Sequence, residues 1–224
     1  TPKEIIAVSS QVGASKIALE LGYEELKRNY YDFGFTKPIS INFPSSAFGY
    51  MEIKELVTDS ELASLGYGYG ITMSPFQIAS AYSVFANNGE YKDFQLLKNE
   101  QVTSRRIISS DSALNILDAL EKVVKDGTGR AAEVKGFSEG GKTGTVHQTR
   151  KGYGYAEDSY RASFIGIAPL NEKSLTIFVS IDEPGLNSYT GGSVAAPVFA
   201  KIAESSLNHL GSFEDEWIRK YTKY

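Results

Sequence analysis

The chain has 224 residues with 42% hydrophobic content, which is enough to build one large or two small globular domains with a sizeable core. A formal net charge of -4, from 23 basic and 27 acidic residues without a long block of either sign, argues against a nucleic-acid partner. Cysteine is absent, and His147 and His209 do not form a pair at metal-ligand spacing, so we expect no disulfide framework, no metal and no cofactor.

The N-terminal part of the chain predicts helices separated by polar breaks. Thr1 to Glu4 forms a capping box with proline at the first helical position, so a short helix is expected to begin there. A start inside a capping box suggests that the chain has been cut from a longer protein. After the polar break from Ser9 to Gly13, helices are expected from about 14 to 21 and from 24 to 31.

A long connection and a glycine-rich turn follow these helices. Several glycines and prolines between residues 32 and 59 predict irregular structure, and long connections of this kind often act as lids or partner-binding loops. From Gly66 to Gly70, glycine alternates with tyrosine. This alternation fits either close backbone packing beside a site or a plain surface turn.

Two further helices flank a segment of short strands. Ser74 to Gln77 is a second capping box, and the helix that it opens is expected to end at 87–89. The core face of this helix is predicted to hold Ile78, Ala81, Tyr82 and Phe85. Residues 90–108 indicate short strands, after which Ser110 is expected to cap a helix that closes at Gly127 to Gly129. The apolar face of this second helix is predicted to hold Leu114, Leu117, Leu120 and Val124.

In the last third of the chain, apolar residues recur with a period of two, which is typical of strands. Three segments, 140–145, 160–168 and 175–181, predict an antiparallel meander. A final helix is expected to begin near Ala196 and to lie on the sheet. The predicted fold class is therefore α+β, with helices segregated from an antiparallel sheet.

The first strand of this meander carries an ammonium group and two hydroxyl groups. Because side chains alternate along a strand, Thr143, Thr145 and His147 are expected to share one face, while Lys142 leans to the other. Gly144 lets a ligand come close to the backbone. Together these residues predict a binding site for a small anion such as a carboxylate.

Five stretches occur in a fixed order along the chain. They are Ser9-Ser10-Gln11-Val12-Gly13, Gly66 to Ala79, Gly127-Thr128-Gly129, Gly141-Lys142-Thr143-Gly144-Thr145, and Tyr189 to Pro197. In this order they resemble the transpeptidase domain of penicillin-binding proteins, specifically the monofunctional class B type of septal wall synthesis. The resemblance implies part of a penicillin-binding-protein or serine β-lactamase-like fold over residues 1–210, followed by a charged C-terminal tail at 211–224.

The resemblance also implies an activity and roles for named residues. The family consists of peptidoglycan D,D-transpeptidases, which cross-link D-Ala-D-Ala stem peptides through a serine acyl-enzyme and are the targets of penicillin. Ser9 would relay a proton to the departing D-Ala, while Gln11 holds the substrate amide. Lys142 would supply positive potential. The two hydroxyls in the segment Thr143 to Thr145 would bind the terminal carboxylate, and its last backbone N–H would be one oxyanion donor.

Two features depart from the family pattern. The family usually has asparagine where this chain has Gln11, so the amide is kept but is one methylene longer. The family nucleophile belongs to a Ser-x-x-Lys motif, and no such motif occurs in this chain, where Ser15 and Lys16 are adjacent. We therefore expect a C-terminal piece of a transpeptidase, inactive by itself, whose nucleophile lies outside this chain.

Two other functions remain open. A serine β-lactamase or D,D-carboxypeptidase shares the fold and the Lys-Thr-Gly segment. A non-catalytic divisome-binding module would act through the 32–59 connection or the tail. By resemblance the partners are peptidoglycan stem peptides, β-lactam antibiotics, divisome proteins and a glycosyltransferase, with no nucleic acid. No apolar run approaches the roughly 20 residues that span a bilayer, so a membrane anchor is expected outside this chain. The resemblance implies a location at the periplasmic face of the bacterial inner membrane.

Four aromatic residues after the Lys-Thr-Gly segment have more than one possible role. His147 could contact a ligand or lie exposed at a strand end. Tyr153 and Tyr155 could form a lip over the cleft or belong to a solvated loop. Trp217 is expected to anchor the tail, which the order of its charges predicts to be a short docked helix.

Overall fold

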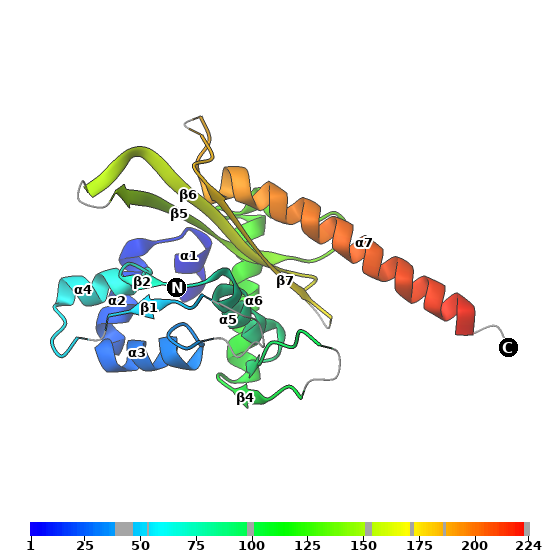
Figure 1. Cartoon of the computed structure of the whole chain (residues 1–224), viewed down its shortest axis with the longest axis horizontal. Coiled ribbons are helices and arrows are strands. Elements are labelled where there is room, and N and C mark those ends of the chain that lie inside the picture. Colours follow the sequence, from blue (N-terminus) through cyan, green and yellow to red (C-terminus); the bar gives the residue numbers. More distant parts are fainter. Residues whose placement is uncertain are drawn as a thin grey trace.

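A computed structural model describes residues 1–38, 47–52, 54–97, 101–150, 154–170, 173–185 and 187–221, with the backbone alone described for 149–150, 154–158 and 212–221. Within these residues the chain forms a three-stranded antiparallel sheet that is packed between helices (Figure 1). The α+β fold class predicted from the sequence is therefore confirmed.

Most of the helices precede the main sheet and gather beside it (Figure 1). Capping boxes start three of them, at Thr1, Thr58 and Ser74, where the hydroxyl accepts a hydrogen bond from the third helical amide and the Glu or Gln at that position bonds back. Within the described ranges these helices are α1 (Pro2–Ala7), α2 (Gln11–Leu21), α3 (Tyr23–Asp32), α4 (Asp59–Leu65), α5 (Pro75–Ala86) and α6 (Ser110–Lys125).

Some of the predicted helix boundaries were wrong. Helix α2 begins at Gln11 instead of about 14, because the Ser10 side chain caps it by accepting a hydrogen bond from the backbone N–H of Gly13 at 3.1 Å. Helix α6 is capped by Ser109 and not by Ser110. Helix α4 begins at the end of the 32–59 connection and was not predicted. Residues 39–46 and 53 of that connection lie outside the described residues.

The main sheet is the predicted meander. Its strands are β5 (Gly140–Arg150), β6 (Gly154–Ala168) and β7 (Leu175–Asp182), in the spatial order β5-β6-β7. The register pairs Lys142 with Ile165, and Ile165 with Phe178. Two short antiparallel pairs accompany this sheet: β1 (Tyr50–Met51) with β2 (Ile71–Thr72), which was not predicted, and β3 (Glu90–Lys92) with β4 (Ser104–Arg106), which confirms the short strands expected there.

The core lies between the sheet and the last helix. A 3-10 turn, η1 (Arg130–Ala132), follows α6, and a π-helical turn, η2 (Gly191–Ala195), leads into α7 (Ala196–Tyr221). The ring of Phe199 on α7 packs against that of Phe164 on β6 with centroids 5.0 Å apart, and both side chains are fully buried. Burial of this apolar surface is the main force that holds α7 on the sheet.

Helix α7 continues beyond the sheet and away from the rest of the molecule (Figure 1). The short helix expected in the tail is thus the end of α7, which runs to Tyr221 without interruption. A boundary between a domain and a tail at residue 210 stays a prediction. The side chain of Trp217 and the tyrosines at 153 and 155 lie outside the described side chains. Among the described helices, none combines the length and the apolar character that crossing a membrane requires.

The predicted core faces of α5 and α6 were only partly right. In α5 the predicted Ala81 is buried, but Ile78, Tyr82 and Phe85 are half-buried. In α6 Leu114 is 56% exposed, because the helix packs against α1 and β5 through a face that bears smaller residues in its first turn. The fully buried residues of the two helices are Gln77, Ser80, Ala81, Val84, Ala113, Ala119, Leu120, Val123 and Val124.

Gln77 connects three segments inside the protein. Its side chain is 1% exposed. The Oε1 atom accepts hydrogen bonds from the backbone N–H of Gly49 at 2.6 Å and of Ser74 at 2.9 Å. The Nε2 atom donates to the backbone carbonyls of Phe35 and Lys37, each at 2.9 Å, and to that of Gly34 at 3.1 Å. One buried amide therefore joins the turn after α3, the segment before β1 and the start of α5.

The glycine-tyrosine alternation forms the turn after α4. At Gly66 a Cβ atom would lie 2.6 Å from the Cβ of Ala18, so α4 and α2 approach closely at this point. Tyr67 and Tyr69 are exposed on the other side of the turn. Close backbone packing is thus confirmed at Gly66 and a surface turn at the two tyrosines, while a place beside a functional site stays a prediction.

Candidate active site

Ser9 is the middle residue of a three-residue corner between α1 and α2. Its φ angle is +57°, in the left-handed region that L-residues other than glycine, asparagine and aspartate seldom adopt. The corner is closed by a hydrogen bond from the backbone N–H of Ser10 to the carbonyl of Ile5 at 2.9 Å. Ser9 is exposed, so the surrounding hydrogen bonds hold its hydroxyl at the surface in a strained backbone.

Lys142 on β5 reaches across to this corner. Its Nζ atom donates to the Oγ atom of Ser9 at 2.8 Å and to the backbone carbonyl of Thr143 at 3.1 Å. The side chain is half-buried, and this burial lowers the pKa of Lys142 to about 8. A lysine with that pKa is neutral in roughly a tenth of molecules at pH 7, so it is able to exchange a proton with its hydroxyl partner.

The two threonine hydroxyls of β5 have different partners. The Oγ1 atom of Thr143 lies 2.8 Å from the Oγ1 atom of Thr128 and 3.5 Å from the Nζ atom of Lys142. The Oγ1 atom of Thr145 accepts a hydrogen bond from the backbone N–H of Gly191 at 3.0 Å. A backbone N–H can only donate, so the proton of the Thr145 hydroxyl is left to donate elsewhere.

Glycines bring the start of η2 against β5. A Cβ atom at Gly191 would lie 2.2 Å from the carbonyl oxygen of Ser163 and 2.5 Å from that of Gly144, distances that no side chain tolerates. The Gly144 backbone is therefore in direct contact with the segment that begins α7. This contact fixes the strand edge that carries Thr143 and Thr145.

The structure brings most of the predicted site residues together but not all of them. Ser9 and Lys142 are in contact, and Thr143 to Thr145 adjoin them on the same strand. Gln11 lies at the first position of α2 with an exposed side chain, and within the described residues its amide has no hydrogen-bonding partner. The roles proposed for these residues stay predictions, although the two segments do face each other.

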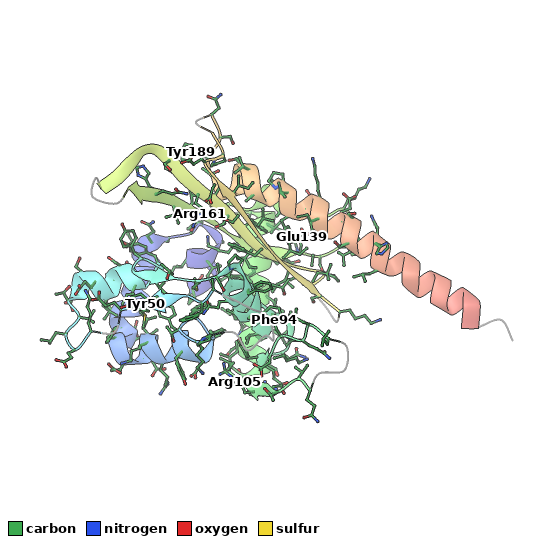
Figure 2. All side chains as sticks on the ribbon, in the orientation of Figure 1. Tyr50, Phe94, Arg105, Glu139, Arg161 and Tyr189 are labelled. Carbon is green, nitrogen blue, oxygen red and sulfur yellow. The ribbon has the colours of Figure 1, made fainter. Side chains whose placement is uncertain are left out.

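A stack of three aromatic rings lies farther along the strands. His147 stacks on Tyr160 with centroids 4.7 Å apart, and Tyr160 stacks on Tyr189 with centroids 4.2 Å apart. Tyr189 lies at the same end of the sheet as Arg161, the residue after Tyr160 on β6 (Figure 2). His147 is therefore half-buried in a stack, and the antiparallel register that pairs it with Tyr160 was the signal that could have revealed this.

Thr128 is the residue near the site whose role was missed. The sequence marked its turn as the end of a helix and as part of a family resemblance, and nothing in the spacing indicated a bond to Thr143. In the described part of the chain, no group of three or more His, Asp or Glu side chains is arranged to hold a metal ion. A cavity of about 720 Å³ between α3 and residues 48–51 lies elsewhere and contains none of the predicted site residues.

Comparison with known proteins identifies the family. The family described as "Penicillin binding protein transpeptidase domain" matches residues 1–204. The chain belongs to this family. The transpeptidase fold expected from the motifs is confirmed as well, since the chain superposes with a TM-score of 0.85 on the apo transpeptidase domain of Burkholderia pseudomallei penicillin-binding protein 3, at 36% identity, covering 94% of this chain and 64% of that one.

Two further similarities define how much of a transpeptidase this chain represents. A probable peptidoglycan D,D-transpeptidase, PbpC of Pseudomonas aeruginosa, is 36% identical over 208 residues, which are 92% of this chain and 37% of that protein. Penicillin-binding protein 3 of Mycobacterium tuberculosis, solved in complex with aztreonam, gives a TM-score of 0.82 at 25% identity and covers 94% of this chain and 52% of that one. The transpeptidase domain here thus spans a minor part of the curated relative.

Proposed function

We propose that this chain is the C-terminal part of a serine-type peptidoglycan D,D-transpeptidase that cross-links stem peptides during cell-wall synthesis. The observation that supports this best is the 2.8 Å contact between the Nζ atom of Lys142 and the Oγ atom of Ser9. It joins the two motifs that the family chemistry requires side by side. The names of the relatives agree with this proposal.

In the first step a serine hydroxyl attacks the carbonyl of the penultimate D-Ala. We propose that this serine belongs to a Ser-x-x-Lys segment outside the present residues. The new C–O bond forms, the C–N bond to the terminal D-Ala breaks, and the proton of the serine must reach the departing amine. Ser9 accepts a hydrogen bond from Lys142, so the Ser9 hydroxyl can donate its proton to the leaving nitrogen and regain one from Lys142. The lysine of the Ser-x-x-Lys segment would take the proton of the attacking serine and return it to Lys142, so that one proton leaves the attacking serine and one reaches the amine.

The strand β5 then accounts for recognition of the substrate carboxylate. The hydroxyls of Thr143 and Thr145 lie on the same strand edge as the Lys142 ammonium, which is positively charged in most molecules at neutral pH because its pKa is about 8. The Thr145 hydroxyl has its proton available, because its oxygen is already an acceptor for Gly191. Charge-assisted hydrogen bonds of this kind are about twice as strong as neutral ones.

The second step decides between the candidate activities. An amine from a second stem peptide that attacks the acyl-enzyme completes a cross-link, whereas water completes hydrolysis, as in a D,D-carboxypeptidase or a β-lactamase. Gln11, which is exposed beside Ser9, is the residue of this chain that we propose to hold the substrate amide. Because glutamine has one more methylene group than asparagine, its amide reaches farther from the backbone of α2.

The proposal is tested by covalent labelling of the intact protein with a fluorescent penicillin. We expect a label that survives boiling in detergent and is released slowly, while Ser9→Ala and Lys142→Ala each slow labelling roughly a hundredfold. Ser60→Ala, which removes the hydroxyl of an exposed residue on α4, is the matched control and should label like the wild type. Rapid release of opened β-lactam would identify a β-lactamase, and absence of label on the intact wild type would contradict the proposal. The 224-residue chain alone should take up no label.

The cellular setting is part of the same proposal. Stem peptides of the wall lie outside the cytoplasmic membrane, so we propose the periplasmic face of the inner membrane as the site of action, with the anchor outside these residues. Division proteins and a glycosyltransferase are the partners we propose from the class B motifs. Localisation of a fluorescent fusion of the intact protein to the division septum would support this setting, and a uniform cytoplasmic signal would contradict it.

A further inference from the structure

The turn after α6 touches both sides of the candidate site. Its residue Thr128 is exposed and sits between two glycines. On one side, a Cβ atom at Gly127 would lie 2.3 Å from the carbonyl oxygen of Ala7, two residues before Ser9. On the other side, a Cβ atom at Gly192 would lie 2.3 Å from the carbonyl oxygen of Thr128. The backbone of Thr128 is therefore held between the Ser9 corner and the segment that begins α7.

The Thr128 side chain ends a chain of polar atoms that crosses the site. The Oγ atom of Ser9 is 2.8 Å from the Nζ atom of Lys142, which is 3.5 Å from the Oγ1 atom of Thr143, which in turn is 2.8 Å from the Oγ1 atom of Thr128. A hydroxyl has one proton to donate. If Thr143 donates that proton to a substrate carboxylate, the bond to Thr128 persists only with Thr128 as the donor.

We propose that Thr128 is a positioning residue that orients the Thr143 hydroxyl toward the substrate carboxylate. By donating to the Thr143 oxygen it fixes the rotamer of Thr143 and polarises the hydroxyl that meets the anion, since hydrogen bonds in series strengthen one another. Thr128 acts through Thr143 and does not itself contact the substrate. The inference rests on the proposed transpeptidase function, because it assigns the carboxylate to this strand edge.

The test compares a penicillin with its methyl ester, which lacks the carboxylate, on the intact protein. Thr128→Val keeps the shape of the side chain and removes the hydroxyl. We expect it to lower the second-order rate of acylation by the penicillin roughly threefold to tenfold, the range of one net hydrogen bond, and to leave the rate with the ester unchanged. Thr128→Ser should restore the wild-type rate. Thr103→Val, which removes an exposed hydroxyl beside β4, is the control and should change neither rate.

Two results would overturn the inference. One is an unchanged rate for Thr128→Val with the penicillin, and the other is an equal loss with both compounds, which indicates a general structural defect. Failure of the wild type to be acylated at all would refute the proposed function instead. The inference would then be decided by crystal structures of the variants. An unchanged Thr143 rotamer in Thr128→Val would overturn it. A rotamer that is altered in Thr128→Val but not in the control Thr103→Val would support it.

Discussion

Lys142 and Ser9 are 133 positions apart in the chain, yet the Nζ atom of one lies 2.8 Å from the Oγ atom of the other. The contact joins the edge of the sheet to the corner between the first two helices. The ability of Lys142 to release a proton to Ser9 near neutral pH depends on the half-burial of the lysine. A fully solvated ammonium would release its proton only at high pH.

Protein stability should respond to pH through Lys142. Its pKa is about 8 in the folded protein and 10.5 in the absence of burial, so between these values the unfolded state binds more protons. The free energy of unfolding is therefore expected to rise with pH across that window. Denaturant titrations of the intact wild type and of Lys142→Met at pH 7, 8.5 and about 10 would check this. The stability advantage of the variant should shrink as pH rises, and a difference that is constant with pH would contradict the assignment.

The strained backbone at Ser9 predicts that two substitutions with the same effect on activity will differ in stability. Ser9→Gly and Ser9→Ala both remove the hydroxyl, so both should slow acylation strongly. Only glycine adopts a φ of +57° without steric cost, so Ser9→Gly should be more stable than Ser9→Ala by about 1 kcal/mol. Thermal unfolding of the two variants side by side measures this difference. Equal stabilities would mean that the corner stores no strain.

Gly191→Ala should disturb the site through packing. Its new methyl group would meet backbone oxygens of Ser163 and Gly144, which cannot rotate away. We expect a loss of about 1 to 3 kcal/mol in the free energy of unfolding and a lower acylation rate. The control is Gly211→Ala, where a Cβ atom meets nothing within 4 Å and should add up to about 1 kcal/mol of helix stability. Wild-type stability in the Gly191 variant would show that the segment moves freely.

Gln77→Leu should be among the most damaging single substitutions outside the site. It leaves two backbone N–H groups and three backbone carbonyl groups without their buried partner. Each unsatisfied group costs about 1 to 3 kcal/mol, so a loss of several kcal/mol is expected even though leucine is apolar. Chemical denaturation against Gln101→Leu, an exposed control, provides the measurement. A loss below about 1 kcal/mol would mean that water replaces the amide.

The sequence predicted those parts of the fold that depend on local rules. The capping boxes at Thr1 and Ser74 and the period of two in the last strands gave the helices and the meander, because caps and alternation act over a few residues. A capping box at Thr58 also starts α4. This helix was not predicted, because the glycines and prolines before it indicated irregular structure. The exposure of Leu114 was not predictable, because it depends on which neighbours α6 meets in the folded protein.

The site was predictable to the extent that it repeats a family pattern. The order of the motifs led to Ser9, Lys142 and the threonines of β5, and the structure brings these together. The bond from Thr128 to Thr143 was not predictable, since it arises where a turn and a strand 15 residues apart meet in space. Likewise, residue spacing does not show that the Gln11 amide has no hydrogen-bonding partner among the described residues, because this depends on the folded surface.

Under the proposed function, the contact of Gly191 with Gly144 also limits how the protein can evolve under antibiotic selection. Gly191 cannot gain a side chain without moving the backbone, because a Cβ atom there would meet the carbonyl oxygens of Ser163 and Gly144. Mutations that reshape the proposed drug-binding edge are therefore expected at neighbouring positions that already bear side chains. Resistance by small steps is then expected to arise at residues such as Gln11 and Thr128, where exchange alters the surroundings of the drug and leaves the framework intact.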